Sequence, residues 1–146
     1  MATQRRGERR GRQKERGMDQ VGDNALMPTL RQILSERLFT ELDNVQPTSR
    51  LITDLRVDSL DFVDLQFVLE ERFGIQFGRG EFFDATPDWV TKDGYLQPQA
   101  IERMSDVVPD LSELARQGPV PVKEFFGRLT VETLDRMIRR QLAKTS

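Results

Sequence analysis

Between Asp58 and Gly74 the sequence carries a complete set of signals for one amphipathic helix. Asp58 or Ser59 can cap the first turn, and Asp61 places a negative charge where the helix dipole favours it. Gly74 is suited to end the helix. The apolar positions recur every four residues and consist of Leu65, Leu69 and Phe73, with Phe62 and Val68 on or beside the same face. The sequence therefore predicts a helix over residues 59–73.

Two further segments show helical periodicity, and no strand pair is convincing. The first covers residues 28–42, where Pro28 suits a first turn and the apolar stripe is Leu30, Ile33, Leu34, Leu38 and Leu42. The second covers residues 130–142, where Thr130 is the expected cap and the stripe is Leu134, Ile138 and Leu142. Residues 43–57 read as a loop, anchored on the core by Leu51, Ile52 and Leu55. We therefore expect an all-α fold.

Residues 78–128 are punctuated densely by glycine and proline. Short helices are plausible at 81–84, 98–105 and 110–116, and residues 122–126 suit either a short helix or an extended segment. A structureless connection of this length is uncommon in a compact domain, so we expect it to fold in part. The expected anchors are Phe82, Phe83, Trp89, Tyr95, Leu96, Ile101, Leu111 and Leu114.

The composition excludes several classes of function. The chain has no histidine and no cysteine, which excludes a serine nucleophile with its usual histidine base, cysteine catalysis, and histidine or thiolate metal sites. No apolar run approaches the roughly 20 residues that span a bilayer. Lack of cysteine also excludes a disulfide scaffold, and a cytoplasmic location is the default expectation. The sequence thus predicts no catalytic residue and no metal site.

The N-terminal segment differs from the rest of the chain. Residues 1–17 contain seven arginines or lysines against two glutamates, so the remainder is acidic. Residues 1–22 have almost nothing apolar, and we expect them to be a disordered basic tail. A basic tail can bind nucleic acid, but no aromatic interleaves with these arginines, so a plain flexible tail is favoured and no nucleic-acid partner is expected. Met18 offers an alternative start codon.

The segment around Ser59 resembles the acyl carrier protein family at its modified serine. The resemblance covers roughly residues 28–77 and 128–143. It is carried by five stretches, which are 51–55 (LITDL), 58–61 (DSLD), 63–65 (VDL), 69–74 (LEERFG) and 130–134 (TVETL).

The resemblance implies a bundle of three main helices, here with short helices in an insertion. Residues 23–146 would form one acyl carrier domain, with the insertion at about 78–128. A phosphopantetheinyl transferase would attach 4′-phosphopantetheine from coenzyme A to Ser59, and the thiol of that arm would carry acyl groups as thioesters. The chain would be a non-catalytic monomer serving acyl-loading and acyl-transferring enzymes: synthases, ligases or acyltransferases. The insertion resembles an enlarged region of some specialised bacterial carriers, which implies a specialised fatty acid, lipid or polyketide-like pathway.

The helix that follows Ser59 also suggests a surface for partner proteins. Its acidic residues would steer partners with basic patches, and they are Asp58, Asp61, Asp64, Glu70 and Glu71. Phe67 would add an apolar contact if it is exposed, although a place in the core is equally consistent with its spacing. Arg56 holds the position where the family usually has glycine, two residues before the aspartate. It weakens any argument that the backbone needs a positive φ there, and it indicates an altered choice of transferase or partner.

Other interpretations stay open at this stage. Ser59 can be a helix cap alone, and the acidic residues can be an ordinary solvated surface. The chain can be an aminoacyl or peptidyl carrier, or an unmodified interaction module with a basic nucleic-acid-binding tail. The insertion can be a lid over the acyl chain, a docking surface for partners or a small subdomain, and the docking surface is preferred.

Overall fold

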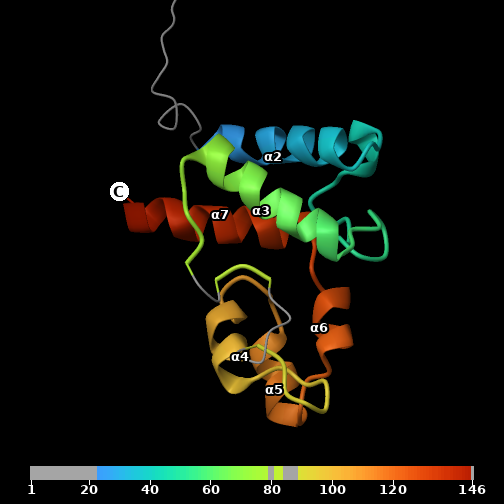
Figure 1. Cartoon of the computed structure of the whole chain (residues 1–146), viewed down its shortest axis with the longest axis vertical. Helices are drawn as coiled ribbons and strands as arrows, with labels where there is room; N and C mark the ends of the chain where they lie inside the picture. The colour runs from blue at the N-terminus through green and yellow to red at the C-terminus, as the bar shows by residue number, and fades with distance from the viewer. Residues whose placement is uncertain (1–22, 79–80, 84–88, 146) are drawn as a thin grey trace, which may run out of the picture.

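The structure, a computed structural model, describes residues 23–78, 81–83 and 89–145 (Figure 1). Six α-helices and one short 3-10 helix follow one another in these residues. They are α2 (Asp23–Arg37), η1 (Leu42–Asn44), α3 (Ser59–Phe73), α4 (Pro98–Met104), α5 (Leu111–Gln117), α6 (Val122–Gly127) and α7 (Val131–Thr145). Within this part of the chain three isolated β-bridges form but no strand, so the all-α prediction is confirmed. None of the described helices is both long and apolar enough to cross a bilayer.

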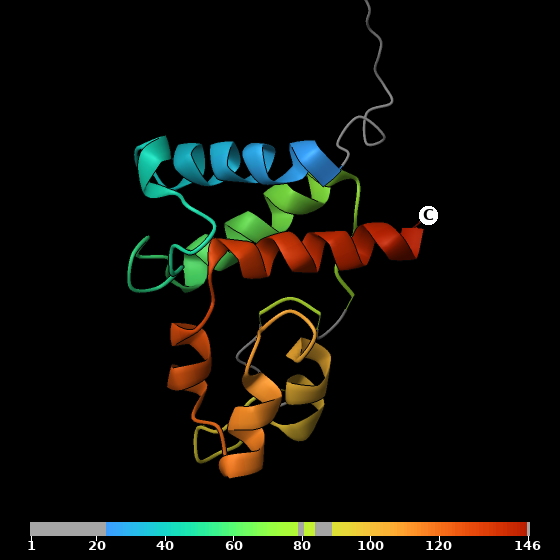
Figure 2. The same ribbon diagram turned by 180° about the vertical axis from the view of Figure 1, so that it is seen from behind.

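The three long helices α2, α3 and α7 form one packed bundle (Figures 1 and 2). Helix α7 contacts both α2 and α3, and its Leu134 and Ile138 are fully buried. On α3 the predicted stripe is confirmed, because Leu65, Leu69 and Phe73 have no exposed surface. The remaining core side chains of these helices are Leu26, Leu30, Ile33 and Leu34 of α2, Phe62 of α3, and Val131 and Met137 of α7.

Helix α2 differs from the prediction at both ends. It begins at Asp23, so Pro28 is its sixth residue, and the missing N–H of Pro28 removes a single hydrogen bond near the helix start. It ends at Arg37 because Phe39 turns left-handed with a φ of 55°. The backbone N–H of Thr40 then donates to the Ser35 carbonyl at 3.1 Å, which closes the last turn.

The loop before α3 is tied to the start of α7. The Leu51 N–H donates to the Leu129 carbonyl at 2.9 Å, and the Val131 N–H donates to the Ser49 carbonyl at 3.0 Å. Leu51 and Leu55 are buried and Ile52 is half-buried, as predicted for the anchors of this loop. These bonds fix where α3 begins relative to α7.

The insertion folds into the three short helices α4, α5 and α6, which lie together below the long bundle in Figure 1. The predicted helices 98–105 and 110–116 are confirmed as α4 and α5 with small shifts, and 122–126 is the helix α6. The helix predicted at 81–84 is wrong for residues 81–83, which form a bend, and residue 84 is outside the described residues.

The expected anchors of the insertion divide by burial. Phe82, Trp89, Leu96 and Leu111 are buried, and Phe83, Ile101 and Leu114 are half-buried against the core. Tyr95 is exposed, which corrects the prediction for its ring. Its backbone makes the contacts instead: its carbonyl accepts from the Thr91 N–H at 2.7 Å, and it bridges to Pro121.

Among the described residues, the insertion contacts the bundle through aromatic rings, through an ion pair between Lys144 of α7 and Glu81, and through a hydrogen bond from α7 to α4. The ring of Phe62 on α3 lies 4.9 Å from the ring of Phe83 and 5.9 Å from that of Phe126 on α6, measured between centroids. Farther along, Arg140 of α7 donates from Nη1 to the Arg103 carbonyl of α4 at 2.5 Å. The insertion therefore packs against the first turn of α3 and against α7. The basic tail predicted for residues 1–22 lies outside the described residues.

Candidate functional site

Ser59 is the first residue of α3 and lies within a complete capping box. The Asp58 carboxylate accepts from the Asp61 N–H at 2.8 Å, and the Asp61 carboxylate accepts from the Asp58 N–H at 3.0 Å. The two acids thereby satisfy each other's backbone and fix the start of the helix. Asp58, rather than Ser59, is the N-cap, so capping does not explain the serine.

The side chain of Ser59 is exposed, and no hydrogen bond engages its hydroxyl among the described residues. The backbone N–H groups of Ser59 and Leu60 also lack an acceptor within that part of the chain. A free hydroxyl at a helix N-terminus, with two unpaired donors beside it, fits a phosphoester at Ser59. The chain itself supplies no thiol.

Arg56, three residues before Ser59, adopts a φ of 61°. The sequence-based expectation that the backbone needs no positive φ at this position is therefore wrong. The loop requires a left-handed residue here to bring the chain from Leu55 into the cap, and arginine accepts the strain that glycine would avoid. Its side chain is exposed and makes no ion pair with any described residue.

The acidic residues predicted for partner binding mostly have local partners as well. Asp58 and Asp61 form the capping box, and Asp64 pairs with Arg37 of α2 at 3.0 and 2.5 Å. The hydrogen bond from Arg37 lowers the pKa of Asp64, and the same contact raises the pKa of Arg37.

The last two acidic positions on α3 differ from each other. Glu70 accepts from the Phe77 N–H at 2.9 Å and so holds the chain that leaves α3. Glu71 is exposed and has no hydrogen bond or ion pair from its side chain within the described chain. All five acidic side chains nevertheless keep contact with solvent, so the surface of α3 is negative.

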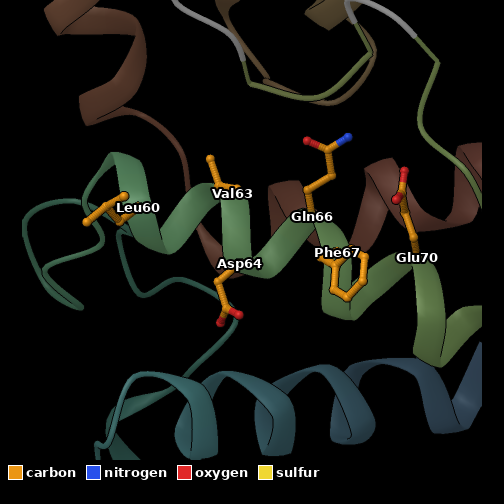
Figure 3. Close-up of a pocket in the computed structure, with 6 residues that line it drawn as sticks. All are labelled: Leu60, Val63, Asp64, Gln66, Phe67 and Glu70. Atoms are coloured by element: carbon orange, nitrogen blue, oxygen red, sulfur yellow. The ribbon is translucent and has the colours of Figure 1, made fainter.

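An apolar strip follows the outer surface of α3 beside these acids (Figure 3). Leu60, Val63 and Phe67 are exposed at 78%, 68% and 70%, so Phe67 is not a core residue. A surface groove of about 480 Å³ is lined by Leu60, Val63, Asp64, Gln66, Phe67 and Glu70. We call these six residues the α3 groove. It begins one residue beyond Ser59, and sequence reasoning identified Phe67 but missed Leu60 and Val63.

Phe39 is a further exposed apolar residue that sequence reasoning missed. It is 94% exposed and lies just beyond the end of α2. A groove of about 450 Å³ is lined by Glu36, Arg37, Phe39 and Asp64. Sequence reasoning placed Phe39 inside a helix over residues 28–42. A residue inside a helix has an ordinary negative φ, so neither the left-handed turn nor the exposed ring was expected.

Comparison with known proteins agrees with this geometry. Residues 28–87 match the family model described as a phosphopantetheine attachment site. Over 48 residues the chain is 42% identical to an acyl carrier protein of Helicobacter hepaticus, covering 33% of this chain and 63% of that protein. Over 44 residues it is 39% identical to the acyl carrier protein AcpXL of Mesorhizobium japonicum, covering 30% of this chain and 47% of that protein.

The chain spans less than two thirds of the length of either relative. No solved structure matches the chain significantly. The family model describes the covalent attachment of phosphopantetheine, and it spans the whole of α3 with the capping box and the free serine. Residues 28–87 are thus similar to phosphopantetheine attachment sites, and part of this chain is similar in sequence to acyl carrier proteins.

Proposed function

We propose that Ser59 carries 4′-phosphopantetheine and that the chain holds acyl groups as thioesters on this arm without catalysing a reaction itself. One observation carries the assignment to Ser59. The matched segment contains three serines, and Ser35 and Ser49 both use their hydroxyls in hydrogen bonds, to the carbonyls of Thr40 at 2.6 Å and Asn44 at 2.9 Å. Only the Ser59 hydroxyl is free among the three, and it is the exposed one.

The residues around Ser59 support transfer to its hydroxyl by a partner enzyme. The capping box fixes the first turn of α3, so the hydroxyl has a defined position in front of a docking enzyme. No histidine is present to activate the serine, and the carboxylates of Asp58 and Asp61 are engaged in the capping box, which supports a base supplied by the phosphopantetheinyl transferase. The arm, once attached, supplies the reactive thiol that a chain without cysteine lacks.

The surface beside Ser59 supports docking of enzymes that load or accept acyl groups. The α3 groove offers three exposed apolar side chains, and the negative residues on the same helix favour partners with basic surfaces. We propose Asp58, Asp61, Asp64, Phe67, Glu70 and Glu71 as contacts of these partners, with Arg56 at the edge nearest the loop. Apolar anchors surrounded by charge are the usual composition of such transient interfaces.

The insertion supports a specialised fatty acid, lipid or polyketide-like pathway. Its helices share the core of the bundle through Phe62, so enzymes approaching Ser59 meet a wider surface than α3 alone. We propose that it serves as a docking surface for partners of that pathway. Deletion of residues 84–122 with unchanged loading by those partners would remove this part of the proposal.

The attachment is tested by intact-mass measurement after incubation with coenzyme A and a phosphopantetheinyl transferase. The wild-type protein is expected to gain the mass of one phosphopantetheine group, and Ser59→Ala is expected to gain none. Ser35→Ala and Ser49→Ala are matched controls from the same segment and are expected to be modified. Modification of Ser59→Ala, or no gain by the wild type with several transferases, would contradict the proposal. Loading of the modified protein by acyl ligases rather than aminoacyl ligases would establish the acyl cargo.

A further inference from the structure

Phe39 is the most exposed large apolar side chain in the described part of the chain, at 94%. It is also one of three non-glycine residues there with a positive φ, at 55°. Both properties oppose folding, since a left-handed phenylalanine is strained and an exposed ring gains nothing from the core. Two bonds between Ser35 and Thr40 hold the turn nonetheless: the Thr40 N–H to the Ser35 carbonyl at 3.1 Å, and Ser35 Oγ to the Thr40 carbonyl at 2.6 Å.

The position of Phe39 connects it to the α3 groove. Asp64 lines both the α3 groove and the groove that contains Phe39. The ion pair between Arg37 and Asp64 fixes the end of α2 against α3, so Phe39 has a defined place relative to that helix. Asp64 lies five residues after Ser59, a rise of about 7.5 Å along the helix axis. An interface of ordinary size, about 800 Å² on each partner, is wide enough to extend from Ser59 past Asp64 toward Phe39.

The charges around Phe39 indicate the chemistry of the partner. Glu36 and Glu41 are exposed on either side of it in the sequence, whereas Asp64 across the groove is paired with Arg37, which lines the same groove. An enzyme that delivers phosphopantetheine must bind the phosphates of coenzyme A, and it therefore carries basic side chains near the point where the serine enters. An acidic surface around an aromatic anchor complements such an enzyme.

We propose that Phe39 is a second docking anchor, beyond the α3 groove, which inserts into an apolar pocket of the phosphopantetheinyl transferase that modifies Ser59. The inference rests on the proposed function, because it assumes that Ser59 is modified. The left-handed turn projects the ring away from the core of this chain, and a phenylalanine ring offers large contact area with only two side-chain torsions to fix on binding. On this proposal, the left-handed backbone at Phe39 lowers the stability of the chain but presents the ring to the partner enzyme.

The test measures the KM and kcat of a phosphopantetheinyl transferase for the unmodified protein, together with the Tm of each variant. Phe39→Gly and Phe39→Asn remove the ring and suit a left-handed residue. Each is expected to raise KM roughly tenfold with kcat unchanged. Their Tm is expected to rise by about 1–4 °C, because the strain is relieved. Phe39→Leu keeps an apolar anchor and the strain, so both KM and Tm should stay near the wild-type values.

Two further variants separate the possible causes. Asp110 of the insertion is also left-handed, with a φ of 72°, so Asp110→Gly is expected to raise Tm and leave KM unchanged. Phe67→Ala reports on the α3 groove and is expected to raise KM. An unchanged KM in Phe39→Gly alongside a raised KM in Phe67→Ala would overturn the inference and leave the proposed function intact. Failure of every variant, the wild type included, to be modified would overturn the proposed function and the inference with it.

A second copy of this chain is the other possible occupant of the Phe39 surface. Light scattering over a range of concentrations distinguishes it. A monomer at all concentrations is expected for the wild type and for Phe39→Gly. A wild-type dimer that Phe39→Gly abolishes would assign Phe39 to self-association and overturn the inference.

Discussion

Replacing Arg56 by glycine should stabilise the protein without removing any contact between described residues. Arg56 holds a φ of 61°, and a left-handed non-glycine residue costs about 1–2 kcal/mol. Glycine removes this strain, but its greater conformational freedom in the unfolded chain destabilises the folded state by about 0.5–1 kcal/mol. The expected net gain is about 0.5–1 kcal/mol in the free energy of unfolding. For a chain of this length, that gain corresponds to a rise in Tm of about 1–4 °C.

The assay is urea unfolding with thermal melts, compared between Arg56→Gly and two controls. Arg56→Ala removes the same charge but keeps a Cβ in the left-handed region, so no gain is expected from it. Thr53 is exposed in the same loop and has no positive φ, so Thr53→Gly is expected to lose about 0.5–1 kcal/mol. Equal gains in Arg56→Ala and Arg56→Gly would show that charge, not backbone strain, limits stability here and would refute the reasoning. A loss of stability in Arg56→Gly would refute it as well.

Three other predictions concern the surroundings of Ser59. Phe62→Ala should lower the free energy of unfolding by about 3–5 kcal/mol in urea titrations, because it removes the ring that packs between α3 and the insertion. A loss below about 1 kcal/mol would contradict that contact. Arg37→Ala should raise the pKa of Asp64 toward its ordinary value of 3.8, as followed by NMR. The folded-state pKa of Asp64 is lowered, so the pair stabilises the protein fully at pH values above the unfolded-state pKa. This stabilisation is lost as the pH falls through the folded-state pKa. Plots of Tm against pH for the wild type and the variant should therefore converge in acid. Glu71→Gln should raise the KM of the transferase at low salt without changing Tm, and an unchanged KM there would contradict a steering role.

The elements that sequence reasoning predicted well are those whose signals are local and mutually consistent. Helix α3 has its cap, its first-turn acid, its stripe and its terminal glycine within the seventeen residues from Asp58 to Gly74, and Gly74 indeed has a φ of 65°. Helix α7 likewise begins beside Thr130, whose hydroxyl accepts from the Thr133 N–H at 3.3 Å. Each signal is a property of a few adjacent residues, so no knowledge of the tertiary structure is needed to interpret it.

The features that sequence reasoning missed depend on backbone conformations that the residue type disfavours. Arginine at position 56 and phenylalanine at position 39 both argue against a positive φ, yet both adopt one. At position 56 the tertiary bonds from Leu51 to Leu129 set the path of the loop, and at position 39 the turn is closed by Ser35 and Thr40. Propensity is a weak guide where distant contacts determine the path of the chain, and functional sites are where such conflicts are expected.

The acidic side chains of α3 have two physical roles that a single substitution does not separate. Asp58 and Asp61 hold the first turn, Asp64 holds α2, and Glu70 holds the segment after the helix, so neutralising any of the four alters stability as well as charge. If such a variant binds its partner enzyme less well, the cause can be a displaced Ser59 or a weaker electrostatic attraction between α3 and the enzyme. Glu71 lacks a local contact within the described chain, so its substitution reports on the field alone. The same reasoning makes Phe39 informative, because there the expected changes in stability and in docking have opposite signs.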